Sequence, residues 1–261
     1  MTSDVWNPSQ YHRFRDERRR PFEDLLALVQ PVPGGSVIDL GCGTGELTLE
    51  LHRHTDAAST LGIDSSINML ESARKLQTEQ VRFDLCDVET LRPGHDFDLI
   101  FSNAALHWVA DHPTLFARLS ILVRSGGQLA VQMPANYDQP SHVAAKVVAS
   151  SSPFHEALDG YVHPEHVLEP LEYARILFEA GFARQEVRLQ VYGHVLEDVS
   201  QIAEWTRGTL LTDYQKRMSG RLFEDFVSSY KDEVAKRVGD PRPCFFPYKR
   251  ILIWGRKSPS A

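Results

Sequence analysis

Short apolar runs alternate with amphipathic segments along the first half of the chain. Five runs have the length and composition of buried strands, at residues 36–40, 60–63, 81–86, 97–101 and 128–133. Three intervening segments have helical composition or periodicity, at residues 46–51, 67–76 and 115–123. Strands that alternate with helices are typical of a doubly wound, Rossmann-like α/β fold with a parallel sheet.

Beyond residue 134 the pattern becomes looser. We expect a small-residue helix, a Ser-, Pro- and His-rich loop or lid, a clear helix and an alternating strand, at residues 142–149, 150–170, 171–181 and 183–192. Residues 198–211 and 221–238 are predicted to be the helices of a cap, and residues 245–256 a last strand that closes the sheet.

The first predicted strand ends in a glycine-rich turn. Glycines at positions 41, 43 and 45 allow positive φ and let the backbone approach a ligand closely. The N–H groups that open the following helix favour an anionic group. Asp39 precedes the first glycine by two residues, where a carboxylate repels a pyrophosphate but can accept a hydrogen bond from an ammonium group. We therefore expect a small anionic or zwitterionic ligand over this turn.

Two further acidic residues follow predicted strands. Asp64 ends the second strand, where an acidic side chain reaches ribose hydroxyls in doubly wound folds. Asp87 follows the third strand. Strand ends that carry Asp39, Asp64 and Asp87 fit a nucleoside with an amino-acid tail better than a dinucleotide.

Composition narrows the class of partner. The chain has 261 residues, a net charge of −7 and a pI near 5.9. Binding to the phosphates of nucleic acid requires a dominant basic face, so this charge argues against nucleic acid as the main partner. Cysteines 42, 86 and 244 form no disulfide framework and fit a reducing compartment. No apolar run approaches the length of a membrane helix, and the N-terminus lacks the apolar core of a signal peptide. We expect a cytoplasmic monomer or weak homodimer that binds neither nucleic acid nor membrane.

Four segments, in order, resemble motifs of the class I S-adenosylmethionine-dependent methyltransferases. They are VIDLGCGTG at residues 37–45, GIDSS at 62–66, CDV at 86–88 and FDLIFSNAALHWV at 97–109. In that family they form the first motif, the end of the second strand, the adenine-side loop, and the fourth strand with its following loop. The resemblance implies S-adenosyl-L-methionine as methyl donor and a seven-stranded sheet of order 3-2-1-4-5-7-6, with its last strand, residues 249–255, antiparallel.

Further segments resemble the trans-aconitate 2-methyltransferase family. They are WNPSQYHRFRDERRRPF at residues 6–22, AVQMPAN at 130–136 with PSH following, and FFPYKRILI at 245–253. The resemblance is dense over the first 142 residues and the last dozen, and thin over residues 143–243. It implies O-methylation of a carboxylate on a small-molecule acceptor, giving a monomethyl ester.

Position in these motifs and strand ends gives candidate site residues. Those expected at the cofactor are Tyr11, Arg18, Arg20, Asp39, Gly41, Cys42, Gly43, Asp64, Ser65, Met69, Asp87, Val88 and Asn103. Those expected at the acceptor are His107, Trp108, Asn136, Tyr173, Arg207 and Tyr248, with His107 also the candidate catalytic residue. Arg18 and Arg20 match the family's E-R-x-R-P pattern, although a solvated helix start is the alternative for the arginine run as a whole.

The motifs and predicted elements also divide the chain into domains. Residues 1–30 are predicted to form an N-terminal lid and first helix, and residues 31–134 the S-adenosylmethionine-binding core. Residues 135–170 and 195–243 are predicted to be substrate cap insertions over the carboxyl edge of the sheet, and residues 171–194 and 244–257 the remaining core elements.

The chemistry of a carboxylate acceptor needs little from the protein beyond positioning. A carboxylate is ionised at neutral pH, so no general base is required. A tricarboxylate would demand cations, and further candidates for that role are Arg15, His142, Arg242, Lys249 and Arg250. For Arg207, next to Trp205 in the fold's predicted cap, an exposed helix face is the alternative.

Other functions stay open. A set of aromatic residues could line an apolar pocket for a larger hydroxyl, amine or isoprenoid acceptor, with His107 as base: Phe154, Tyr161, Tyr173, Tyr192, Phe245, Phe246 and Tyr248. The chain could also be a cofactor-binding regulator that transfers nothing. The segment 163–166, His-Pro-Glu-His, lacks a further cluster of ligands, so we predict no metal.

Overall fold

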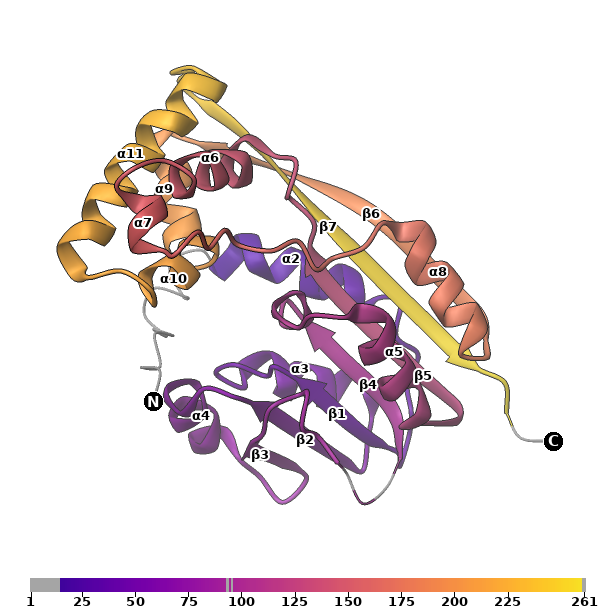
Figure 1. Cartoon of the computed structure of the whole chain (residues 1–261). Coiled ribbons are helices and arrows are strands. Elements are labelled where there is room, and N and C mark those ends of the chain that lie inside the picture. The colour runs from indigo at the N-terminus through magenta and orange to yellow at the C-terminus, as the bar shows by residue number, and fades with distance from the viewer. Residues whose placement is uncertain (1–14, 93, 95, 260–261) are drawn as a thin grey trace. The chain divides into compact units, whose positions relative to one another are not determined.

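The computed structural model describes residues 15–92, 94 and 96–259 of the chain. Within these residues seven strands form one sheet of order β3-β2-β1-β4-β5-β7-β6, which confirms the predicted fold class and strand order (Figure 1). The strands are β1 (Ser36–Leu40), β2 (Ser59–Asp64), β3 (Val81–Leu85), β4 (Phe97–Asn103), β5 (Val123–Pro134), β6 (Phe182–Leu196) and β7 (Cys244–Lys257).

The helices fall between these strands, most of them where the hydrophobic pattern predicts, although the short helix at residues 154–157 lies in the segment predicted to be a loop or lid. They are α2 (Arg15–Leu26), α3 (Glu46–Thr55), α4 (Ile67–Ala73), η1 (Arg74–Leu76), η2 (Leu106–Trp108), α5 (His112–Ile121), α6 (Pro140–Ala149), α7 (Phe154–Ala157), α8 (Pro170–Glu179), α9 (Ser200–Arg207), α10 (Leu210–Gln215) and α11 (Gly220–Val238). Among the described residues, none of these helices is long and apolar enough to cross a membrane.

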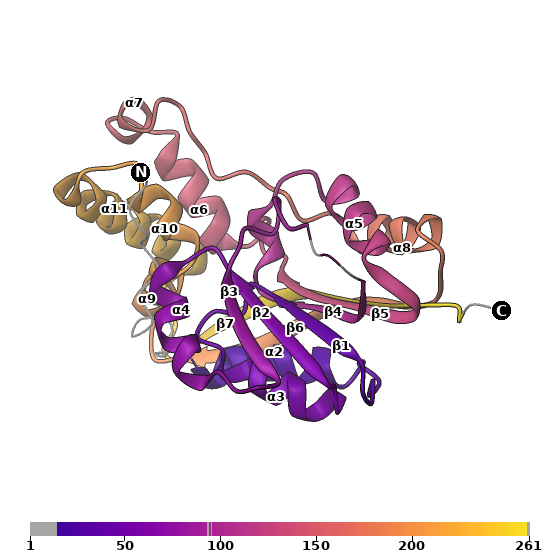
Figure 2. The same ribbon diagram turned by 90° about the horizontal axis from the view of Figure 1, so that it is seen from below.

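The centre of the sheet is parallel and buried. β1 pairs in parallel with β2 and with β4, and β5 pairs antiparallel with β7. The side chains of residues 37–40 in β1 are all buried, because a central parallel strand is covered on both faces. Figure 2 shows α2 and α3 along one face of the sheet and α5 and α8 along the other. On the first face Phe22 of α2 packs edge-on against Phe101 of β4, with 5.7 Å between ring centroids.

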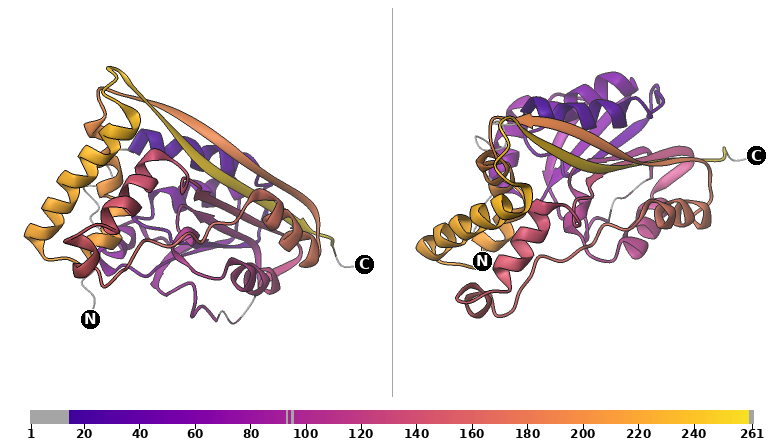
Figure 3. Two further views of the ribbon diagram at one scale, coloured as in Figure 1. Left: turned by 45° about the horizontal axis from the view of Figure 1, so that its top comes forward. Right: turned by 90° about the horizontal axis from the view of Figure 1, so that it is seen from above.

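The chain divides into two compact units. We call residues 15–134, 166–190 and 250–259 the core unit, and residues 135–165 and 191–249 the helical unit. β6 and β7 run side by side and each contributes residues to both units (Figure 3). Within the helical unit, α6, α9, α10 and α11 enclose a hydrophobic core of their own that includes Trp205, Phe226 and Tyr230. The predicted domain limits differ from these by several residues, and the placement of a cap over the carboxyl edge stays a prediction.

Two further predicted elements differ in detail. The helix predicted at 115–123 ends at Ile121, and β5 begins at Val123, earlier than the strand predicted at 128–133. The pairing register of β5 with β4 shifts between Phe97 and Leu99. Gly126 has φ of 76°, which accommodates this irregularity. The single helix predicted at 198–211 is two helices, α9 and α10, because the chain breaks at Gly208 and Thr209.

Candidate functional site

The three glycines of the turn after β1 have positive φ for different steric reasons. Gly41, Gly43 and Gly45 have φ of 77°, 57° and 81°. A Cβ on Gly41 would lie 2.2 Å from the Cβ of Ala105, and one on Gly45 would lie 2.7 Å from the Phe83 ring. A Cβ on Gly43 would meet no atom within 4 Å. The backbone is therefore open to a ligand at Gly43, whereas Gly41 and Gly45 allow close packing within the protein.

Asp64, at the end of β2, is bound to the backbone on both sides. Its Oδ2 accepts a hydrogen bond from the amide of Gly43 at 2.9 Å, and its Oδ1 accepts one from the amide of Ser66 at 2.8 Å. Ser66 in turn caps α4, since its Oγ accepts a hydrogen bond from the amide of Met69 at 3.2 Å. A carboxylate oxygen can accept more than one hydrogen bond, so these two backbone contacts do not by themselves exclude hydrogen bonds from ligand hydroxyls.

Asp39 is buried beneath the turn. It is 4% exposed, and its Oδ2 accepts a hydrogen bond from the hydroxyl of Thr48 in α3 at 2.6 Å. Burial, above all, raises the pKa of the Asp39 carboxyl from 3.8 to about 7, although the Thr48 hydrogen bond opposes this shift. The side chain ties β1 to α3, and its predicted hydrogen bond to a ligand ammonium group stays a prediction.

Other predicted cofactor residues around the turn differ in exposure. Cys42 is 8% exposed and packs with Leu70 and Phe83, and burial raises the pKa of its thiol. Met69 is 4% exposed, which agrees with a core side chain, whereas Ser65 is exposed.

The loop after β3 is held by an arginine that the sequence did not reveal. Asp87 Oδ1 accepts a hydrogen bond from the amide of Glu89 at 2.8 Å, which closes a local turn. Arg118 of α5 donates to the carbonyl of Val88 at 2.7 Å and to that of Leu91 at 3.4 Å. No local motif marks Arg118, because its partners lie about 30 residues earlier in the chain. Asp87 itself is exposed and half-buried Val88 follows it.

The loop after β4 adjoins the glycine turn. Ala105, whose Cβ nearly contacts Gly41, follows Asn103 and Ala104 at the end of β4. Ala104 has φ of 57°, in the left-handed region, and its amide donates to the carbonyl of Gln132 at 2.9 Å. Strained backbone of this kind clusters at functional sites. Since β1 and β4 are neighbours followed by helices on opposite faces, this is the switch point where doubly wound sheets bind ligands.

The predicted acceptor residues His107 and Trp108 lie in η2, directly after this switch point. Both side chains are half-buried, and their rings lie 4.8 Å apart between centroids at an angle of 41°. The core unit thus brings together the glycine turn, Asp64, Asn103 and the start of η2.

The N-terminal predictions lie largely outside the described residues. This is true of Tyr11 and of the side chains of Arg15 and Arg18. The Arg20 side chain is exposed. Arg19, which is not among the predicted site residues, donates to both carboxylate oxygens of Glu50 in α3, at 2.8 and 3.0 Å, and so links α2 to α3.

Two predicted acceptor residues have structural partners instead. The Asn136 side chain is 1% exposed, and its amide pairs with both backbone groups of Lys249, at 2.7 and 2.9 Å. Tyr173 is 0% exposed, and its hydroxyl contacts His112 and accepts a hydrogen bond from the amide of Leu168 at 3.1 Å. Their role at an acceptor stays a prediction, although both side chains are buried in this structure and their polar groups contact the protein.

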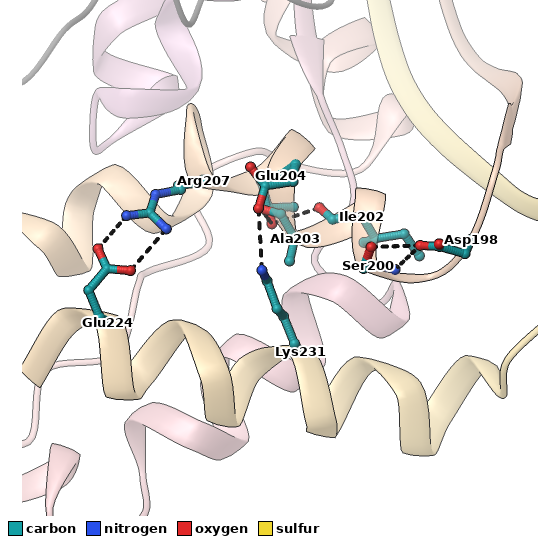
Figure 4. A network of polar contacts seen from close by, with 9 residues as sticks. Asp198, Ser200, Ile202, Ala203, Glu204, Arg207, Glu224 and Lys231 are labelled. Carbon is teal, nitrogen blue, oxygen red and sulfur yellow. Dashed lines mark hydrogen bonds and ion pairs between the residues drawn. The ribbon is translucent and has the colours of Figure 1, made fainter.

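Arg207 and Tyr248 belong to the helical unit. The Arg207 guanidinium pairs with both carboxylate oxygens of Glu224, one of them at 3.2 Å (Figure 4). It also lies 5.5 Å from the Phe223 ring centroid. Tyr248 is 4% exposed and packs against Trp205, 5.6 Å away between ring centroids. Both roles at an acceptor stay predictions, and Tyr248 has little exposed surface to serve one.

The additional cation candidates also have protein partners. Lys249 pairs with Asp138 at 2.6 Å, Arg242 lies 3.6 Å from Asp240, and Arg250 is 5% exposed beside Gln132. Burial lowers the pKa of His142 to about 3, so this histidine is neutral and supplies no positive charge at neutral pH.

His163 binds a carboxylate rather than a metal-ligand cluster. Its Nδ1 lies 3.0 Å from Oδ2 of Asp213, which also accepts a hydrogen bond from Tyr161. Glu165 pairs with Lys146. Within the part of the chain that the structure describes, no group of three or more His, Cys, Asp or Glu side chains is arranged to hold a metal ion.

Comparisons with known proteins agree with this geometry. Residues 31–181 match the family model of a methyltransferase domain. A trans-aconitate 2-methyltransferase of Deinococcus radiodurans is 39% identical over 95% of this chain and 97% of its own length. One of Variovorax paradoxus is 38% identical over 96% of this chain and 95% of its own. The YcgJ protein of Bacillus subtilis shares the fold, with a TM-score of 0.60 and 17% identity over 93% of this chain and all of that one.

These comparisons confirm the predicted methyltransferase class and S-adenosylmethionine as its donor. The match to the curated relatives is nearly full length, so it also extends through the segment where the motif resemblance was thin. The chain belongs to the methyltransferases and, within them, to the family of the curated trans-aconitate 2-methyltransferases.

Proposed function

We propose that this protein transfers a methyl group to a carboxylate oxygen of trans-aconitate, or of a closely similar small polycarboxylate, and forms a monomethyl ester. The observation that carries the proposal is the similarity to enzymes named for that acceptor, at 39% identity over 95% of this chain for one of them. This match extends over both units of the chain. The acceptor's carboxylate is ionised at neutral pH, so the protein's task is to bind, orient and shield it.

The described residues fit the donor. The backbone at Gly43 is open, Asp64 lies at the end of β2 and accepts a hydrogen bond from the amide of Gly43, and the loop at Asp87 and Val88 is held in place by Arg118. We assign the ribose to Asp64, the adenine side to Asp87 and Val88, and the amino-acid end to the region of Gly43 and Asn103. When bound, the donor supplies a methyl group already activated on a sulfonium.

With a carboxylate acceptor, no side chain has to remove a proton. His107 is then a residue that positions the acceptor beside Trp108, not a general base. Partial exclusion of water strengthens the electrostatic contacts within such a site, and this is the protein's main remaining contribution.

The second candidate, transfer to a larger apolar acceptor, finds little support in the helical unit. Phe154, Phe246 and Tyr248 are 4–5% exposed and pack within its hydrophobic core. These rings stabilise the unit itself, and among the described aromatic candidates Phe245 alone is largely exposed, at 62%. The cytoplasmic location and the monomeric or weakly dimeric state remain predictions.

The test is a methyl-transfer screen with the purified chain and isotope-labelled S-adenosylmethionine over carboxylates, phenols and amines. We expect label in a base-labile monomethyl ester of trans-aconitate, identified by mass spectrometry. Label in phenols or amines and not in carboxylates would establish the second candidate. Donor binding by calorimetry without transfer to any acceptor would identify a regulator.

A further inference from the structure

Three polar side chains form a line across neighbouring strands at the end of the sheet that carries the site. Asn103 of β4 pairs in register with Gln132 of β5, and Gln132 pairs with Leu252 of β7. Arg250 lies two residues from Leu252 in β7, so its side chain falls on the same face. Gln132 is 0% exposed, Arg250 is 5% exposed and Asn103 is half-buried.

The hydrogen bonds along this line have one consistent direction. We assign the Gln132 amide with its oxygen toward Arg250, because the opposite orientation places that oxygen against Asn103 Oδ1 and the nitrogen against the guanidinium. In the assigned orientation the Gln132 oxygen accepts from Arg250 Nη1 at 3.0 Å. Its side-chain nitrogen donates to Asn103 Oδ1 at 2.8 Å. The backbone carbonyl of Gln132 also accepts from the amide of Ala104, so one residue holds both the side chain of Asn103 and the strained residue after it.

A guanidinium at one end removes the ambiguity of the two amides. Arginine can only donate, so the atom that Gln132 turns toward Arg250 is its oxygen. The side-chain nitrogen of Gln132 then faces Asn103. Because this nitrogen donates, the atom of Asn103 that faces it must be the acceptor, Oδ1. The Asn103 Nδ2 group is left pointing away from Gln132, at the carboxyl end of β4 beside the switch point.

We propose that Arg250 and Gln132 are positioning residues that fix Asn103 as a hydrogen-bond donor toward a ligand carboxylate. The proposal rests on the methyl-transfer function proposed above, in which two carboxylates reach this edge of the sheet. One is the carboxylate of the donor's methionine end and the other belongs to the acceptor. Either accepts a hydrogen bond from an amide N–H, and neither can donate one when ionised.

The decisive variant is Gln132→Glu. The new carboxylate is nearly isosteric and still accepts from Arg250, but it cannot donate to Asn103 Oδ1. Asn103 must then turn its Nδ2 group inward and present its oxygen to the ligand. The expected result is a loss of at least about tenfold in affinity for the carboxylate that Asn103 binds, because an attractive contact becomes a repulsive one.

Gln128→Glu is the matched control. Gln128 lies four residues earlier in β5 and is 1% exposed, and its side chain contacts Gln30 and Trp254. This variant also buries a carboxylate in β5, so it reports the stability cost, measured by thermal unfolding of both proteins. Ligand affinities in Gln128→Glu are expected to stay near those of the unmodified chain.

Binding of S-adenosylhomocysteine and of its decarboxylated analogue, measured by calorimetry, identifies the source of the carboxylate. A loss for S-adenosylhomocysteine alone assigns Asn103 to the donor, whereas a raised KM for trans-aconitate alone assigns it to the acceptor. A merely structural role of Gln132 would weaken both donor analogues equally and would overturn the proposal. Unchanged affinity for S-adenosylhomocysteine with unchanged KM would overturn it as well.

The two proposals can fail separately. If the unmodified chain does not methylate trans-aconitate but Gln132→Glu selectively weakens S-adenosylhomocysteine, the acceptor assignment fails and the positioning role stands. If it does not methylate trans-aconitate and donor binding is unchanged in the variant, both fail. Should Gln132→Glu not fold, Gln132→Met removes both hydrogen bonds without adding a charge. It is expected to weaken severalfold the binding of the ligand whose carboxylate Asn103 contacts. Unchanged affinity for S-adenosylhomocysteine with unchanged KM for trans-aconitate in Gln132→Met would overturn the proposal.

Discussion

The carboxylate of Asp64 accepts a hydrogen bond from the amide of Gly43 at 2.9 Å and thereby joins the end of β2 to the glycine turn after β1. The same side chain binds the amide of Ser66 at the start of α4. The residue that we assign to the ribose therefore also fixes the shape of the turn to which we assign the rest of the donor, so its removal should affect both stability and donor affinity.

Asp64→Ala is expected to weaken the binding of S-adenosylhomocysteine by about 1–3 kcal/mol, because hydrogen bonds to the ligand and to the backbone are lost. Asp64→Asn keeps one acceptor oxygen, so its affinity for S-adenosylhomocysteine should lie between those of Asp64→Ala and the unmodified chain. Calorimetry gives the affinities, and thermal unfolding gives the stabilities. Asp84→Ala, an exposed carboxylate on β3, is the control. Donor affinity that does not change in Asp64→Ala would contradict the ribose assignment.

Gly43→Ala separates backbone strain from ligand contact. Gly43 and Gly34 both have positive φ, 57° and 71°, and a Cβ on either would meet no protein atom within 4 Å. Each alanine should therefore cost a similar free energy of unfolding, about 1–2 kcal/mol. Donor affinity should fall steeply in Gly43→Ala and stay unchanged in Gly34→Ala. Equal donor affinity in the two variants would place the ligand elsewhere.

Asp39 makes stability depend on pH in a defined direction. Because burial raises its pKa from 3.8 to about 7, the folded state holds this proton more tightly than the unfolded chain does. The contribution of Asp39 is therefore most favourable at low pH and is lost as pH rises from about 4 to about 7.

Asp39→Asn removes this titration and keeps an oxygen for Thr48. Relative to the variant, the unmodified chain should lose about 1–4 kcal/mol of unfolding free energy between pH 4 and pH 7, with no further change above that. Denaturant titrations at several pH values give the difference, and Asp84→Asn is the control. Parallel pH curves for Asp39→Asn and the unmodified chain would show that Asp39 titrates normally.

Arg118→Met should loosen the loop after β3. The guanidinium of Arg118 donates to the carbonyls of Val88 and Leu91. Without it, the affinities for adenosine and for S-adenosylhomocysteine are expected to fall by a similar factor, roughly 3- to 10-fold. Arg53→Met is the control, since exposed Arg53 bonds only within its own helix in the contacts described, to the Leu49 carbonyl. Adenosine affinity that survives Arg118→Met would exclude this loop from the adenine side.

Arg207→Ala tests the role of the helical unit in acceptor binding. The ion pair with Glu224 is partly exposed, with side-chain exposures of 28% and 58%, so its loss should cost less than about 1 kcal/mol of stability. If Arg207 binds the tricarboxylate, the KM for trans-aconitate rises and donor affinity holds. Glu224→Ala leaves the guanidinium in place and should not raise that KM. A flat KM in Arg207→Ala would make the pair purely structural.

The local pattern of the sequence predicted the parts of the site that depend on one segment. The positive φ at residues 41, 43 and 45 and the acidic ends of β1 and β2 follow from composition and spacing, because a strand, a turn and a helix start are each encoded by consecutive residues. The strand order came from the family resemblance, since periodicity carries no information on which strands are neighbours.

The tertiary structure alone decided what each polar side chain contacts. Position along the chain assigned Asn136 and Tyr173 to an acceptor site. In the structure the Asn136 amide hydrogen-bonds the backbone of Lys249, and the Tyr173 hydroxyl contacts the side chain of His112. Arg118 and Arg250 reach Val88 and Gln132 only because segments distant in sequence come together in the fold. Hydrogen bonds between distant segments depend on how strands and helices pack, and no spacing along a single chain specifies that packing.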